Sequence, residues 1–115
     1  DAWHMTMNAY FNWGDPVIGV QRAYVCDNIV VSFFVNNSAY CKEQVDELLY
    51  AAAAESDFDA RKALYDEFQE ITAFDLPFYN INAMPIFGAS QPDVINLPTG
   101  PWGGLSGMEN VWLDR

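Results

Sequence analysis

The chain has 115 residues, and 16 acidic side chains against 5 basic ones give it a formal charge of -11. Hydrophobic residues make up 51 % of the chain, which is enough to bury the core of one domain, so the excess charge does not indicate disorder. The few basic residues are scattered, which excludes nucleic acid as a partner and disfavours anionic membranes, because both bind clustered cations.

The first predicted element is a strand over residues 3–13. Apolar side chains occupy its odd positions and polar side chains occupy most of the even ones, and a period of two is typical of a half-buried strand. Gly14, Asp15 and Pro16 are expected to end it, because proline cannot donate a ladder hydrogen bond.

Two helices are predicted over residues 42–55 and 58–73, after a turn at 36–38 and a stretch, 17–37, that fits either a short helix or a strand. Asp57 is the expected N-cap of the second helix, and the short connection implies an antiparallel helical hairpin packed on a sheet. The expected apolar stripes are Val45, Leu48, Leu49, Ala52 and Ala53 on the first helix, and Ala60, Leu64, Phe68 and Ile71 on the second.

The last third of the chain lacks helical periodicity. Residues 78–87 are predicted to be extended, with an interruption at Pro85. Turn-forming glycines and prolines dominate residues 88–107, and a short strand is predicted at 110–113.

The sequence contains few residues that could form a catalytic site. The only histidine, His4, lies on the polar face of the first predicted strand without metal-ligand partners at suitable spacing, so a surface position is favoured over a metal or catalytic role. No nucleophile–base pair is recognisable, and we expect no enzyme, no metal and no cofactor. Asn36-Asn37-Ser38 matches a glycosylation acceptor, although so short a pattern is common by chance.

The two cysteines, Cys26 and Cys41, flank the predicted turn at 36–38. A chain reversal there could bring them within bridging distance, and a bridge of this span would contribute roughly 3 kcal/mol in the loop-entropy model. Two buried, reduced thiols are the alternative. A bridge would indicate an oxidising compartment.

The turn that follows the first predicted strand, Asn12-Trp13-Gly14-Asp15, is the candidate binding site. An aromatic plane beside a carboxylate can stack on an apolar ligand group and pair with a cationic one, and glycine permits close approach of the backbone. The alternative is a core tryptophan followed by an ordinary Asp-Pro turn.

The predicted hairpin carries the residues of a known family. Residues 40–49 read Y-C-K-E-Q-V-D-E-L-L, residues 61–71 read R-K-A-L-Y-D-E-F-Q-E-I, and residues 75–77 read D-L-P. This pattern closely resembles the C-terminal part of the family 5 extracellular solute-binding proteins, the dipeptide-, oligopeptide- and nickel-type receptors of ABC importers. The ending at 109–113 and the turn around Trp13 are similar to the corresponding regions of those proteins.

The resemblance implies an α/β fold, a fragment of a type II periplasmic-binding-protein-like lobe. Residues 1–77 would supply a strand and the hairpin of the distal lobe, and residues 78–115 would supply the return crossing and the C-terminal strand. The whole chain would then be a fragment of a longer protein. Some relatives have a disulfide where Cys26 and Cys41 stand, so the resemblance favours the bridge.

The function implied is that of the substrate-binding component of an ABC importer. It would bind a small solute or short peptide through Asn12, Trp13, Gly14 and Asp15 and deliver it to the permease subunits in the membrane. The location would be periplasmic or extracellular, and a preceding segment could carry a lipid anchor. In peptide-binding relatives an Asp after the tryptophan pairs with the ligand's α-amine, and Asp15 aligns either with it or with a later Asp-Pro. An autonomous interaction domain with exposed aromatic side chains is the alternative function.

Overall fold

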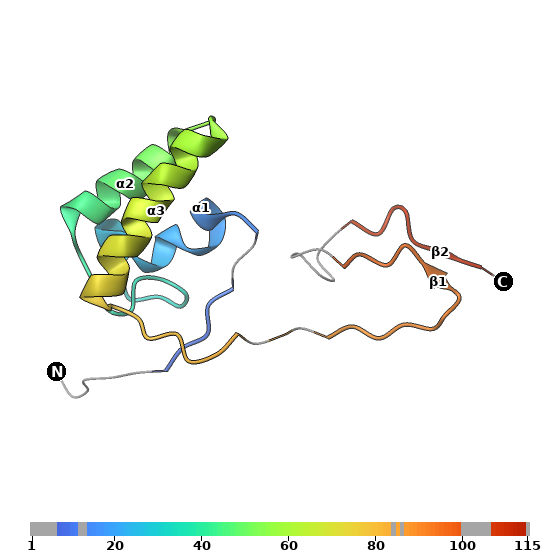
Figure 1. Ribbon diagram of the computed structural model, residues 1–115. Helices are drawn as coiled ribbons and strands as arrows, with labels where there is room; N and C mark the ends of the chain where they lie inside the picture. The colour runs from blue at the N-terminus through green and yellow to red at the C-terminus, as the bar shows by residue number, and fades with distance from the viewer. Residues whose placement is uncertain (1–6, 12–13, 84, 86, 100–106, 115) are drawn as a thin grey trace. The chain divides into compact units, whose positions relative to one another are not determined.

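A computed structural model describes residues 7–11, 14–83, 85, 87–99 and 107–114 (Figure 1). The chain divides into two compact units, Asp1–Tyr79 and Asn80–Arg115, close to the boundary predicted between residues 77 and 78. The helices of the described residues all lie in the first unit, and the second unit contains a two-stranded sheet.

Two antiparallel helices, α2 (Glu43–Ala54) and α3 (Phe58–Asp75), form the predicted hairpin (Figure 1). The predicted N-cap at Asp57 is confirmed, because its side chain accepts a hydrogen bond of 2.9 Å from the amide of Ala60. No side-chain hydrogen bond caps α2 at Lys42, so tertiary packing must stabilise the start of this helix. Both helices agree with the predicted ranges to within two residues.

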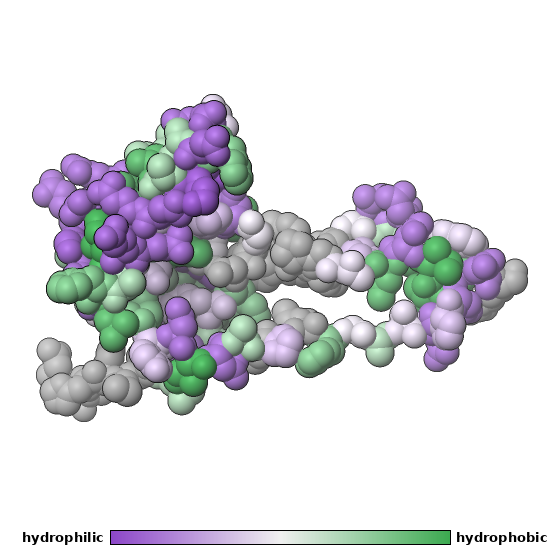
Figure 2. Space-filling model, viewed as in Figure 1, coloured by the Kyte–Doolittle hydropathy of each residue, from purple (hydrophilic) through white to green (hydrophobic). Residues whose placement is uncertain are grey.

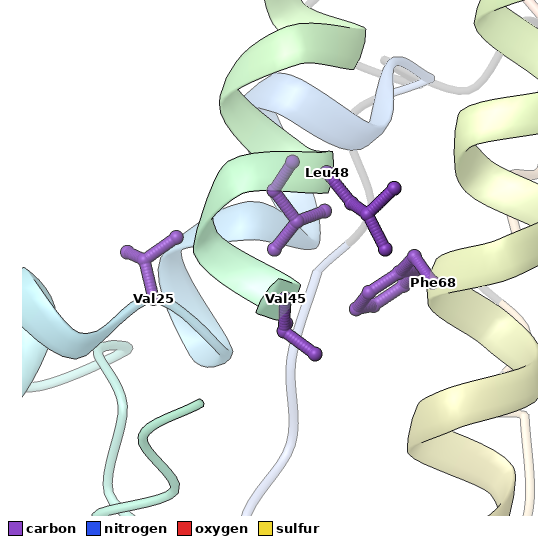
Figure 3. Close-up of a cluster of buried hydrophobic side chains, with 5 residues drawn as sticks. Val25, Val45, Leu48 and Phe68 are labelled. Atoms are coloured by element: carbon purple, nitrogen blue, oxygen red, sulfur yellow. The ribbon is translucent and has the colours of Figure 1, made fainter. Parts of the chain in front are cut away.

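The core of the first unit lies between the hairpin and the segment that precedes it. Figure 3 shows Val25, Val45, Leu48 and Phe68 in one cluster, with Val45 and Leu48 from α2 and Phe68 from α3. Leu49 belongs to the same cluster and is fully buried. Most of the predicted stripe on α2 is therefore buried, but Ala53 and Ala60 were predicted to be part of the stripes and are exposed.

Short helical turns, rather than a sheet, pack against the hairpin. They are α1 (Pro16–Gly19), η1 (Gln21–Ala23) and η2 (Cys26–Asn28). Val20 and Tyr24 pack on the core cluster, and the ring of Tyr24 meets the ring of Phe68 edge-on at 4.9 Å between centroids. The expected packing of the hairpin on a sheet is wrong for the described residues, because the first unit supplies no strand there.

The strand predicted over residues 3–13 is also wrong where the structure describes it, at 7–11. These residues have no regular secondary structure, and Met7 is 83 % exposed. Side-chain contacts hold them in place of a strand ladder: the Tyr10 hydroxyl donates a 2.8 Å hydrogen bond to the carbonyl of Val35, and Phe11 contacts Phe34. An alternating pattern can form a strand only if a partner strand is available.

Helix α3 runs two residues further than predicted and ends at Asp75, with Leu76 as its C-cap. This residue adopts a left-handed conformation with φ 51°, and its amide donates a 2.9 Å hydrogen bond to the carbonyl of Thr72. Pro77 follows and cannot continue the helix. Residues 78–83, 85 and 87 then have no regular secondary structure, which is compatible with the predicted extended segment.

The second unit is built around two short strands, β1 (Val94–Ile95) and β2 (Trp112–Leu113), which pair antiparallel with Val94 opposite Leu113. The predicted strand at 110–113 is confirmed at its second half. Strand β1 was not predicted, because prolines and glycines surround it and two residues show no periodicity.

Candidate functional site

The candidate turn is shaped by three consecutive residues with different backbone roles. Gly14 has φ 87°, a left-handed conformation that favours glycine. Asp15 is the N-cap of α1, and its Oδ1 accepts a hydrogen bond of 2.9 Å from the amide of Val17. Pro16 occupies the first turn of that helix, where its fixed φ suits the helix and no amide donor is needed. The turn therefore has a defined local conformation.

An arginine from the hairpin binds this turn. Arg61 of α3 donates from Nη2 to Asp15 Oδ1 at 2.9 Å and from Nη1 to Asp15 Oδ2 at 3.1 Å, which is a bidentate arginine–carboxylate pair. The Nε of Arg61 donates to the carbonyl of Ala52 on α2 at 2.9 Å, and its guanidinium lies 5.5 Å from the ring centroid of Tyr65. Arg61 thus joins both helices of the hairpin to the turn.

This pairing sets the charge state of both partners. The hydrogen bonds from Arg61, followed by that from Val17, lower the pKa of Asp15 below its ordinary value of 3.8. The same pairing raises the pKa of Arg61. Asp15 is therefore ionised near neutral pH, and a guanidinium already balances its charge.

The space beside the turn is small. A hollow of about 140 Å³ is lined by Gly14, Asp15, Pro16 and Val20, whereas pockets for drug-sized ligands have roughly 300–1,000 Å³. The other predicted binding residues, Asn12 and Trp13, lie outside the described residues. Of the predicted binding residues, the structure thus places Gly14 and Asp15 together, at the beginning of α1. They could form no more than one wall of a binding site.

A larger, open hollow of about 580 Å³ lies over the loop that follows η2. Its lining residues carry no charge: they are Asn8, Ile29, Val30, Val31, Ser32, Asn36, Asn37 and Ala39. Several of its apolar side chains are well exposed, so the loop presents a hydrophobic surface that the sequence did not assign to any site.

A disulfide closes this loop. Cys26 and Cys41 are joined, with 2.11 Å between their sulfurs and 4.7 Å between their Cα atoms. A carboxylate of α2 ties the same point to the hairpin, because both oxygens of Asp46 accept from the amide of Cys26, at 3.1 and 3.2 Å. The start of the loop is therefore bonded to Cys41, two residues before α2, by the disulfide and to Asp46 of α2 by hydrogen bonds.

Asn36 fastens the other side of the loop and is only 2 % exposed. Its Nδ2 donates to the carbonyls of Tyr24, Val25 and Tyr40, at 3.2, 3.0 and 2.6 Å, and its Oδ1 accepts from the hydroxyl of Ser38. The side-chain nitrogen that a glycan would modify is thus buried and bonded. In the folded protein the Asn36-Asn37-Ser38 sequence is a structural turn.

Arg61 and Asp46 were not assigned a role from the sequence, and Asn36 was noted only as part of a turn and a glycosylation match. Each of the three bonds to a residue at least ten positions away, and the longest sequence separation is 46, between Arg61 and Asp15. No local pattern reports such partners. The available signal was that Arg61 belongs to the run that resembles a known family.

No group of three or more potential metal ligands is found within the described residues, and His4 lies outside them. None of the described helices is both long and apolar enough to cross a membrane. Comparison of the chain with family models, with curated proteins and with solved structures gave no match.

Proposed function

We propose that this chain is part of the substrate-binding component of an ABC importer, which captures an extracellular solute, a short peptide, and delivers it to the membrane permease. The observation that carries the proposal is the residue pattern over 40–77, which resembles family 5 solute-binding proteins throughout the hairpin. The hairpin of α2 and α3 lies within this segment, and Asp57 caps the second helix, which supports the proposal.

The position of the candidate turn supports the same proposal. Arg61 holds Asp15 from the hairpin, so a ligand beside Gly14 and Asp15 would meet a wall whose backbone conformation is fixed in advance. A preorganised wall lowers the entropic cost of binding. Receptors of this architecture bind by closing two lobes on a solute, without covalent chemistry.

Exposed apolar side chains indicate that part of this chain contacts another protein surface. In the loop after η2, Phe33 is 87 % exposed and Val31 is fully exposed, while the visible face of the hairpin is mostly hydrophilic (Figure 2). Such a surface is typical of an interface. It suits a lobe that packs on further parts of a receptor, and it equally favours the alternative of an autonomous interaction domain.

Isothermal calorimetry on the complete gene product, with short peptides of mixed sequence, tests the proposal. We expect micromolar binding, and we expect the 115-residue chain alone to bind these peptides poorly, because it holds only one wall of a cleft. Native mass spectrometry of the freshly purified gene product should also detect a co-purified solute.

The two functions differ in a result that needs no ligand. A reading frame that encodes a secretion signal upstream of residue 1 agrees with the receptor. A folded gene product that binds no peptide, carries no co-purified solute and lacks such a signal contradicts the receptor and supports the interaction domain.

A further inference from the structure

Asp15 is the one charged residue of the candidate turn, and both of its carboxylate oxygens are engaged. Oδ1 accepts from the Val17 amide and from Arg61 Nη2, and Oδ2 accepts from Arg61 Nη1, all within 2.9–3.1 Å. These bonds join the carboxylate to its own helix α1 and to α3. Asp15 therefore already accepts hydrogen bonds from a backbone amide and from a guanidinium before any ligand binds.

Arg61 is held by the hairpin independently of Asp15. Its Nε bonds to the Ala52 carbonyl at the end of α2, and its guanidinium stacks near the Tyr65 ring one turn along α3. The side chain of Arg61 is only 28 % exposed, while that of Asp15 is 39 % exposed. The more enclosed and more firmly bonded partner sets the geometry, so the hairpin positions the turn.

A cationic ligand group could bind Asp15 only by displacing this arginine or by approaching it closely. Displacement would leave a partly buried guanidinium without its carboxylate, and approach would place two positive charges side by side. The hollow at the turn offers no second carboxylate among its described lining residues. Arg61 thus already balances the charge of Asp15, and a cationic ligand group would have to compete with this arginine.

We propose that Asp15 and Arg61 form a structural clamp that fixes the Gly14–Val17 turn, and that a solute held at this turn is uncharged or anionic at the end that meets it. Arg61 is then a positioning residue. The statement about the solute rests on the proposed function, whereas the clamp does not.

The clamp is tested on the 115-residue chain by denaturant unfolding of Asp15→Asn, Arg61→Gln and the double variant. Lys62→Gln is the matched control, because Lys62 neighbours Arg61, has the same charge and forms an ion pair with Asp66 of its own helix. We expect both single variants to lower the unfolding midpoint and the double variant to lower it no further than the worse single one. The control should stay at the wild-type midpoint, with helical circular dichroism retained throughout.

Additive single effects, or Arg61→Gln behaving like Lys62→Gln, would overturn the clamp. Hydrogen exchange adds a local readout: the Val17 amide should exchange faster in Arg61→Gln, because the acceptor that caps it loses its support. An unchanged Val17 rate in a destabilised Arg61→Gln variant would mean that the arginine acts elsewhere.

The solute is tested on the complete gene product with a dipeptide and its N-acetyl derivative. A charged hydrogen bond to the free α-amine would favour the free dipeptide by about tenfold or more. We expect nearly equal affinities, and we expect Asp15→Asn to change both by the same factor, because a shifted wall affects both ligands alike.

A preference of about tenfold for the free amine that disappears in Asp15→Asn would overturn the solute statement. If neither dipeptide binds, the proposed function fails and the solute statement fails with it. The unfolding experiment tests the clamp independently of both binding results.

Discussion

Buried hydrogen bonds at single residues hold the first unit together between its short helices. Asn36 alone bonds three backbone carbonyls that belong to both sides of the disulfide-closed loop. Buried carbonyls that lose their donor keep the full cost of their desolvation. Polar side chains at such positions therefore matter more to stability than their number suggests.

Asn36→Ala should destabilise the chain by about 1–3 kcal/mol, because it removes the buried amide that donates to the carbonyls of Tyr24, Val25 and Tyr40. Asn37→Ala is the control, because Asn37 is the next residue, is less buried than Asn36, and loses the same amide group on substitution. Urea unfolding of both variants gives the comparison. Equal losses in the two variants would show that the buried amide has no special role.

The Asp15–Arg61 pair also predicts a pH dependence. The pKa of Asp15 is lowered in the folded state, so the stabilisation from this group is complete above its ordinary value of 3.8 and is lost as the pH falls through the lower folded value. The difference from Arg61→Gln isolates it.

We therefore expect the gap in unfolding free energy between wild type and Arg61→Gln to be constant near neutral pH and to shrink below about pH 4. Denaturant unfolding at a series of pH values measures it. A gap that stays constant down to about pH 2 would show that Asp15 is not the partner through which Arg61 stabilises the fold.

At the scale of the elements, the hairpin could be predicted and its surroundings could not. Helices α2 and α3 carry their own signals, a periodic stripe and a capping Asp57, so local sequence suffices for them. The strand expected at 3–13 had the right periodicity but finds no partner among the described residues at 7–11. Pairing is a property of the whole chain and leaves no local mark.

The same limit applies to the candidate site. Asp15 and Gly14 could be selected because a turn before proline is visible locally, but the partner of Asp15 lies on another element. Without Arg61, an aspartate beside an aromatic residue suggests a cation site. With Arg61, the same aspartate is a structural anchor.

Substitutions within the hairpin should separate its buried and exposed faces. Leu49→Ala should cost about 2–5 kcal/mol, because Leu49 is fully buried between the helices and its truncation leaves a cavity. Phe74→Ala, on the same hairpin, removes a larger side chain that is 90 % exposed and should change stability by less than about 0.5 kcal/mol. Thermal unfolding of both distinguishes them, and a reversed order would refute the core assignment.

The disulfide gives a second prediction at this scale. Reduction of the Cys26–Cys41 bridge, which closes a loop with a sequence separation of 15, should lower stability by about 3 kcal/mol while Asn36 and Asp46 still tie the loop to the hairpin. Unfolding with and without reductant measures the loss, and the Cys26→Ser/Cys41→Ser variant is the control. Helical content that disappears on reduction would show that these hydrogen bonds cannot hold the loop.

At the scale of the whole molecule, a chain of charge -11 combines a hydrophilic hairpin face with an uncharged, apolar loop. The hairpin presents one preorganised turn through Arg61, and the loop presents a surface suited to protein contact. Such a combination is compatible with the proposed receptor, in which this chain would supply one wall of the cleft. In that receptor, the turn that the hairpin holds would contribute to solute binding.

Calorimetric titration of the complete gene product with a short peptide, in wild type, Arg61→Gln and Lys62→Gln, tests that claim most directly. We expect the wild type to bind with micromolar affinity, Arg61→Gln to bind about tenfold more weakly, and Lys62→Gln to bind like the wild type. Folded wild-type protein that binds no peptide, or Arg61→Gln protein that binds as tightly as the wild type, would contradict it.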